Sequence, residues 1–135
     1  MKTKNARRSI GSKKRVGVRP SHALVGTWKE EGDPSETTQA VFTVAVEGGR
    51  FHVSGVDESD GVVFRITDTR WDGERLRFTS MFPTTNHRAK HVFQVIAKGR
   101  ISHQVSYSDE DGDYVGTEVW KKRKQRPQRS GSRRS

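Results

Sequence analysis

Apolar and polar residues alternate with a period of two along most of the chain from Leu24 to Trp120. Phe42, Val44 and Val46, for example, share one parity. Because successive side chains of a strand point to opposite faces of a sheet, this alternation is typical of strands with one buried face. No strong helical pattern interrupts it. We therefore predict an all-β fold.

Glycine-containing links separate the strands and predict their register. The pair Gly48–Gly49 suits a two-residue primed turn, which places Val46 opposite Phe51. The same turn places Val44 opposite Val53, so the apolar faces of the two strands coincide. Pattern and turn chemistry therefore predict the same hairpin.

A second hairpin is predicted around Trp71–Gly73. If these three residues form a type I turn that ends in a left-handed glycine, Ile66 lies opposite Phe78. The apolar faces of these two strands then also coincide.

The hairpin around Ala97–Gly99 has two alternative registers. A three-residue loop places Phe93 opposite His103 and turns His91 inward. A two-residue turn at Lys98–Gly99 would shift the register by one residue and turn His91 outward. We favour the three-residue loop, because it aligns the apolar positions of both strands.

About eight strands follow one another in this way, the first near residues 24–30 and the last near residues 114–122. Most links are short, which predicts an antiparallel up-and-down meander. Eight such strands can close into a small barrel without exposed edges. A two-sheet sandwich fits the same strand count but needs longer connections between its sheets.

The charge is distributed unevenly. The net charge is +10, yet residues 21–120 contain ten Lys or Arg against all sixteen Asp and Glu. The ends, residues 1–20 and 121–135, each contain eight Lys or Arg and no acid. The ends have almost nothing to bury, so we predict a disordered basic arm over 1–21, a barrel over 22–122 and a disordered basic tail over 123–135.

The composition excludes several classes of site. The chain has no cysteine, so disulfides, thiolate metal sites and cysteine nucleophiles are ruled out. No apolar run approaches the roughly 18 residues of a membrane-spanning helix, and no secretory signal is visible. We expect a soluble cytoplasmic protein, with organellar import as a minor alternative.

The two ends of the strand region resemble a known superfamily. A Gly-x-Trp on the first strand, here Gly26 and Trp28, with a basic residue near the end of the last strand, is similar to the calycins, which include lipocalins, fatty-acid-binding proteins and avidins. The resemblance implies that Trp28 lies at the barrel base beneath Lys121, Lys122 or Arg123. The segment looks most like small bacterial lipocalin-like domains, and this implies a lipocalin-like barrel without naming a ligand.

The inward parity of the strands is rich in aromatic side chains, which either fill a small barrel or line a cavity for one small ligand. Our leading hypothesis is a non-enzymatic barrel that binds an apolar or amphipathic small molecule. The candidate ligand-binding residues are Trp28, Phe42, Phe64, Phe78, His91, His103, Tyr107, Glu118 and Trp120. A filled core remains the alternative.

His91, His103 and Glu118 are predicted to converge inside the barrel, with Glu118 opposite His103. Such a group could hold a divalent metal or act in acid–base catalysis. A buried histidine paired with a carboxylate is more often structural, and no nucleophile elbow or phosphate-binding loop is present. We therefore predict no metal, cofactor or catalytic residue.

The basic ends carry two clusters of cations, namely Lys13, Lys14 and Arg15, and Lys121, Lys122, Arg123 and Lys124. Such clusters neutralise phosphates with little sequence preference. The alternative function is therefore an accessory protein whose tails bind nucleic acid or another polyanion, with the barrel as a scaffold. A solubilising tail would explain the same residues.

Overall fold

The computed structural model describes residues 19–124. In this range a short 3₁₀ helix, η1 (His22–Leu24), precedes eight strands. The strands are β1 (Gly26–Glu30), β2 (Ala40–Glu47), β3 (Arg50–Asp57), β4 (Arg65–Trp71), β5 (Arg75–Met81), β6 (Arg88–Ala97), β7 (Arg100–Asp109) and β8 (Gly112–Lys122). The predicted all-β fold is confirmed. Residues 19–124 contain no helix that is long and apolar enough to cross a bilayer.

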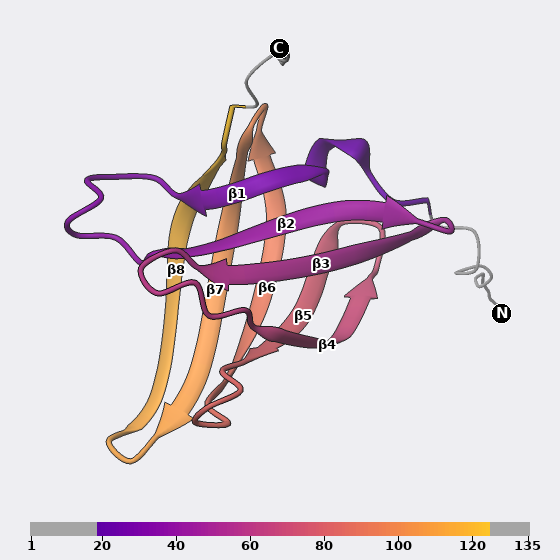
Figure 1. The fold of residues 1–135 in the computed structure, drawn as a ribbon. Helices are drawn as coiled ribbons and strands as arrows, with labels where there is room; N and C mark the ends of the chain where they lie inside the picture. The colour runs from indigo at the N-terminus through magenta and orange to yellow at the C-terminus, as the bar shows by residue number, and fades with distance from the viewer. Residues whose placement is uncertain (1–18, 125–135) are drawn as a thin grey trace, which may run out of the picture.

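The eight strands form one antiparallel sheet that curls into a nearly closed barrel (Figure 1). The sheet order is β3-β2-β1-β8-β7-β6-β5-β4, so the last strand pairs with the first and the edges are β3 and β4. A single bridge between Val56 and Val63 joins these edges. Two backbone hydrogen bonds flank it, from the Asp57 N–H to the Val62 carbonyl at 2.9 Å and from the Phe64 N–H to the Gly55 carbonyl at 3.0 Å. The predicted meander is therefore correct, and its seam lies between β3 and β4.

Two of the three predicted hairpin registers are confirmed. Val46 pairs with Phe51 through the turn at Gly48 and Gly49. In the hairpin of β6 and β7, Phe93 pairs with His103. This second register depends on a bulge between residues 95 and 97, which adds one residue to β6 ahead of the tight turn.

The predicted register of the β4–β5 hairpin is wrong. Ile66 pairs with Ser80 and not with Phe78, because the turn is wider than expected and shifts the pairing by three residues, and a bulge between Thr67 and Arg70 then reverses one of the three. The error is two residues, and a shift of two leaves each side chain on the same face of the sheet. The inward and outward faces of β4 were therefore still predicted correctly up to the bulge.

Aspartate side chains account for this difference. Asp68, inside the bulge, has a φ of 56°, a left-handed conformation that aspartate tolerates better than most residues. At the turn, the Asp72 carboxylate accepts hydrogen bonds from the backbone N–H groups of Glu74 and Arg75, at 2.9 and 2.7 Å. These bonds stabilise a wider turn than the glycine alone suggested.

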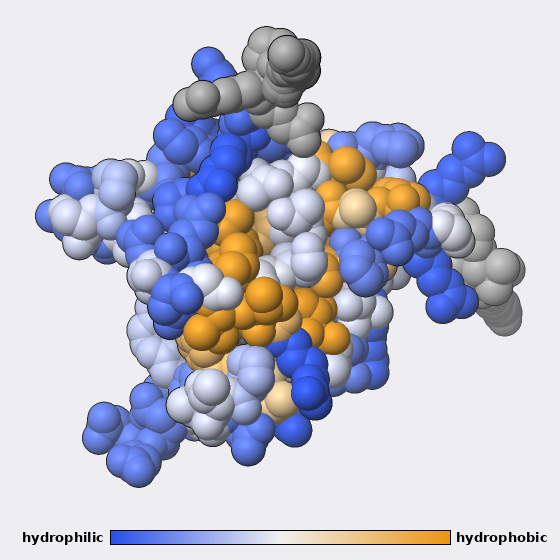
Figure 2. Space-filling model, viewed as in Figure 1, coloured by the Kyte–Doolittle hydropathy of each residue, from blue (hydrophilic) through white to orange (hydrophobic). Residues whose placement is uncertain are grey.

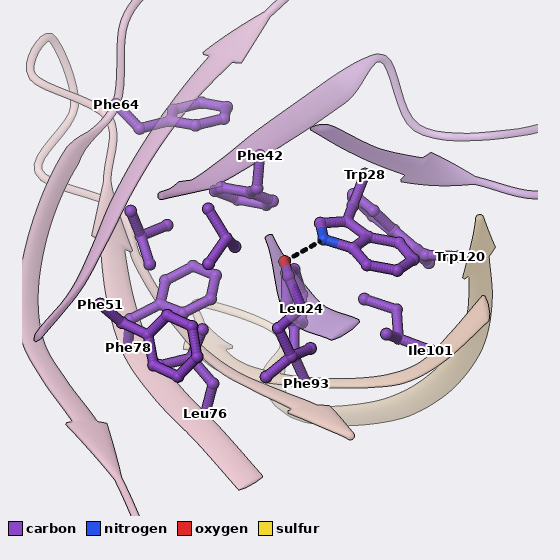
Figure 3. Close-up of a cluster of buried hydrophobic side chains, with 12 residues drawn as sticks. Leu24, Trp28, Phe42, Phe51, Phe64, Leu76, Phe78, Phe93, Ile101 and Trp120 are labelled. Atoms are coloured by element: carbon purple, nitrogen blue, oxygen red, sulfur yellow. Dashed lines mark hydrogen bonds between the residues drawn. The ribbon is translucent and has the colours of Figure 1, made fainter. Parts of the chain in front are cut away.

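One end of the barrel is closed by η1 and a packed apolar cluster (Figure 3). Leu24 from η1 and Trp28 from β1 have no exposed surface. The indole N–H of Trp28 donates a hydrogen bond of 2.8 Å to the carbonyl oxygen of Leu24. Phe93 and Ile101, also fully buried, pack in the same cluster. This end of the barrel is solid.

A lysine from the last strand lies over the buried tryptophan. Trp28 pairs with Lys122 across β1 and β8, and the Lys122 ammonium nitrogen lies 5.4 Å from the centre of the indole ring. Gly26 allows this approach, because a Cβ there would lie 3.0 Å from the Lys122 side chain. The arrangement combines a cation–π contact with packing of the lysine stem.

A glycine on β3 makes room for two core aromatic rings. A Cβ at Gly55 would lie 2.6 Å from the ring of Phe42 and 2.9 Å from that of Phe64. Both rings are more than nine-tenths buried, so neither can move away freely.

We predict that Gly55→Ala destabilises the barrel by about 1–3 kcal/mol, the usual cost of overpacking a core. The measurement is the free energy of unfolding in urea. Ser54→Ala, an exposed neighbour on the same strand, is the matched control and should change this free energy by less than about 0.5 kcal/mol. Equal effects of the two variants would show that the core does not need a glycine there.

Candidate functional site

The barrel interior beyond the packed end contains a pocket of about 410 Å³. More than half of its lining residues come from β6, β7 and β8. Figure 2 shows apolar side chains gathered in the middle of this face of the molecule, with polar side chains around them. Three other depressions are larger, at about 790, 490 and 450 Å³; the first two include outward-facing side chains such as Lys90 and Ser106, and the third is lined mostly by loop residues such as Asp60 and Thr84. The inner pocket is the candidate site because it is aromatic and contains buried polar groups.

Most of the ligand-binding residues expected from the sequence line this pocket. They are Phe42, Phe64, His91, His103, Tyr107, Glu118 and Trp120. The sequence reasoning missed a further set, namely Thr38, Ala40, Ser80, Phe82, His87, Ala89, Val105 and Tyr114. Several of these share the inward parity of residues that were chosen, and Ser80 lies two residues from Phe78 on β5. Parity alone could therefore have identified those on strands, whereas Thr38 and His87 lie in links just before β2 and β6.

Two expected residues lie elsewhere. Trp28 is fully buried in the packed end and does not line the pocket. Phe78 is 2% exposed and stacks on the imidazole of His91, with ring centres 4.8 Å apart. It therefore supports the pocket wall from behind.

Polar side chains from four successive strands form a row in this wall, hydrogen-bonded to one another from Ser80 to His103. The Ser80 hydroxyl lies 2.7 Å from Nε2 of His91. Nδ1 of His91 lies 2.8 Å from Nε2 of His103. Nδ1 of His103 in turn lies 3.7 Å from Oε1 of Glu118, which accepts a hydrogen bond of 2.9 Å from the indole N–H of Trp120. We call Ser80, His91, His103 and Glu118 the relay.

Electrostatics favours one orientation of the protons in the relay. His103 Nδ1 faces a carboxylate, so a proton is favoured there and a lone pair would be repelled. Nε2 of His103 must then accept from Nδ1–H of His91. Nε2 of His91 is left to accept from the Ser80 hydroxyl. Both rings are neutral in this arrangement, and all donors point toward Glu118.

Burial keeps the two histidines uncharged. His91 and His103 are 5% and 2% exposed. Burial lowers the pKa of His91 from its ordinary value of 6.5 to about 4. Burial, and then the repulsion from a protonated His91, lower the pKa of His103 to about 2. The carboxylate of Glu118, at 3.7 Å, does not offset these effects.

The relay leaves one buried atom without a good partner. Among the residues that the structure describes, Nδ1 of His103 makes no hydrogen bond, and 3.7 Å is too long for one to Glu118. No group of three or more His, Asp or Glu side chains in residues 19–124 has a metal-binding arrangement. The two imidazoles use their facing nitrogens on each other, so these nitrogens are not available to a metal.

The two basic clusters are placed differently. Lys13, Lys14 and Arg15 lie outside the described residues. In the second cluster, Lys122 lies over Trp28, and Arg123 donates two hydrogen bonds of 2.8 Å to the carboxylate of Glu58. Part of this cluster therefore closes the barrel, while nucleic-acid binding through the tails stays a prediction.

We predict that the free energy of unfolding decreases as the pH is lowered from about 6.5 to about 4, because of the relay histidines. In this window the unfolded chain, with an ordinary histidine pKa of 6.5, binds protons that the folded His91 and His103 do not. Their contribution is complete above 6.5 and falls by up to about 1.4 kcal/mol per pH unit for each histidine below it. The free energy of urea unfolding at pH 7, 6 and 5 measures this slope.

Two variants test whether the relay histidines cause this pH dependence of the unfolding free energy. His103→Gln should remove about half of it, whereas His52→Gln, at a histidine whose side chain is 59% exposed, should leave it unchanged. The carboxyl group with the most strongly lowered pKa, Asp72 at about 2, acts only at lower pH. A flat stability between pH 7 and 5 would contradict the prediction.

Comparison with known proteins adds no further identification. No protein-family model, curated protein or solved structure matches this chain. The function must therefore be inferred from the geometry of the barrel and its pocket.

Proposed function

We propose that this protein is a non-enzymatic binding protein that holds one small amphipathic molecule inside its barrel. The observation that carries the proposal is the division of the interior into a solid end and an open end. The open end has a volume of about 410 Å³, within the range of about 300–1,000 Å³ that is typical of small-molecule sites. A filled core, the alternative expected from the sequence, would leave no such space.

The lining suits a molecule with both apolar and polar parts. Phe64 and Phe82, whose rings pack edge to face at 4.9 Å, provide an apolar wall. The phenol rings of Tyr107 and Tyr114 stack at 4.9 Å, and their hydroxyl groups can donate or accept hydrogen bonds. Apolar walls with a few placed polar groups are typical of ligand pockets.

The resemblance to the calycins supports the same proposal. In that superfamily a tryptophan at the barrel base lies under a basic residue of the last strand, and Trp28 and Lys122 have this relation here. The eight-stranded meander has the expected strand order as well. We infer that the barrel is lipocalin-like, with its cup at the end away from Trp28.

The relay is poorly suited to catalysis. A general base works best when its pKa lies near the working pH. His91 is the imidazole that could accept a proton from Ser80, and its pKa of about 4 makes it a weak base at neutral pH. The relay instead provides hydrogen bonds for Ser80, His91 and His103 in a buried wall, while the indole N–H of Trp120 orients the carboxylate of Glu118.

We predict that filling the pocket abolishes ligand binding without unfolding the barrel. Ala89 lines the pocket, so Ala89→Trp should occupy much of the space. The probe is N-phenyl-1-naphthylamine, which is uncharged at neutral pH and fluoresces more strongly in an apolar site. Ala89→Trp should weaken its binding at least tenfold.

Lys90→Trp is the matched control, because Lys90 is exposed on the opposite face of the same strand. It should bind the probe like the wild type. Failure of the wild-type protein to bind this probe or any related apolar molecule would refute the proposed function. Equal binding by the two tryptophan variants would place the bound probe outside the pocket.

A further inference from the structure

The charge of the pocket is carried by one side chain. Among residues 19–124, which the structure describes, Glu118 is the only acid in the lining, and no lysine or arginine lines the pocket. The two relay histidines are neutral, because burial lowers the pKa of both. With Glu118 ionised, the pocket has an excess of negative charge.

Glu118 also differs from other carboxylates of the barrel in its partners. Glu31, Glu58 and Asp72 each form an ion pair of 2.8 Å with an arginine. The carboxylate of Glu118 is less exposed than any of these, at 29%, yet no lysine or arginine in residues 19–124 lies within ion-pair distance of it. A partly buried carboxylate without a cation is unfavourable unless something compensates for the lost hydration.

The hydrogen bonds at Glu118 leave part of the carboxylate available. Oε1 accepts the indole N–H of Trp120 and is the oxygen nearest to His103. Oε2 makes no hydrogen bond to the part of the chain that the structure describes. Oε2 is therefore free, while Oε1 of the same carboxylate is held in place by Trp120. This favours a fixed geometry for a ligand group that binds to Oε2.

Aromatic rings accompany this carboxylate. The indole of Trp120 and the ring of Phe42 stack with centres 5.8 Å apart and border the pocket, but each residue is only 1% exposed, so little of either ring face is open to a ligand. The stacked pair of Tyr107 and Tyr114 lines it as well. Faces of aromatic rings attract cations, most strongly where water is partly excluded.

We propose that the ligand of this pocket is an organic cation, a protonated amine attached to an apolar body. Its ammonium group pairs with the carboxylate of Glu118, and its apolar body lies against the aromatic wall of the pocket. This inference rests on the proposed binding function and specifies the chemical class of the ligand. It follows from an unpaired carboxylate, neutral histidines and aromatic rings in one cavity.

A matched set of probes tests the sign of the ligand charge. Octylamine, octanol and octanoate share one alkyl chain and differ in charge, being cationic, neutral and anionic at pH 7.5. We expect the wild-type protein to bind octylamine at least tenfold more tightly than octanol, and octanoate most weakly. Displacement of N-phenyl-1-naphthylamine, checked by calorimetry, measures all three affinities.

Glu118→Gln removes the charge and keeps an oxygen that can accept from Trp120. It should reduce the affinity for octylamine to that for octanol and leave octanol binding unchanged. Glu110→Gln, an exposed acid outside the pocket, is the control and should preserve the preference. Unfolding in urea checks that both variants remain folded.

The outcomes separate the two proposals. If octylamine and octanol bind equally to the wild type, or if Glu118→Gln does not change their ratio, the cationic ligand is refuted while the binding barrel stands. If Glu118→Gln weakens all probes equally, Glu118 is structural and the inference also fails. If no probe binds the wild-type protein, the proposed function fails with it.

Discussion

The fully buried contact between Trp28 and the 3₁₀ helix is the constraint on which the rest of the interior depends. A small barrel with eight strands can be filled completely by its own side chains. Here the hydrogen bond from the Trp28 indole to the Leu24 carbonyl fixes the helix inside one end, and Lys122 covers the same ring. Apolar residues are few in this chain, at 30% of the sequence, and several of the fully buried ones, namely Leu24, Phe93 and Ile101, pack at this end. The opposite end is therefore left with space and with polar side chains.

The relay follows from this concentration of apolar groups. Polar groups inside a barrel must find partners, since an unsatisfied buried group costs about 1–3 kcal/mol. Ser80, His91 and His103 meet this need by bonding to one another across β5, β6 and β7. The hydrogen bonds end at His103, whose Nδ1 faces the carboxylate of Glu118 on β8 at 3.7 Å, and part of that carboxylate stays accessible. A structural requirement thus leaves one charged group oriented in a pocket that is otherwise apolar or neutral.

Sequence reasoning predicted the parts of this arrangement that depend on parity. The meander, the inward positions of His91 and His103, and the pairing of His103 with Glu118 all follow from a period of two combined with turn chemistry. It could not predict the helix that closes the barrel, because three residues carry no periodic signal. The hydrogen bond between the two imidazoles depends on side-chain conformations, which parity does not specify. The pocket itself depends on how far the apolar residues fill the interior, and this is a property of packing.

The two bulges show why register matters for the site and not only for the fold. The bulge in β4 changes the pairing by one residue, and together with the wide turn at Asp72 it leaves Ile66 two residues from its expected partner and on the same face. The bulge in β6 adds one residue before a tight turn. Without that residue the register would slip by one, and His91 would point outward while His103 stayed buried. Nε2 of His103 would then lose its partner, so the carboxylate of Glu118 would face an imidazole with no fixed tautomer. A backbone irregularity at the end of β6 is therefore part of the binding site that it positions.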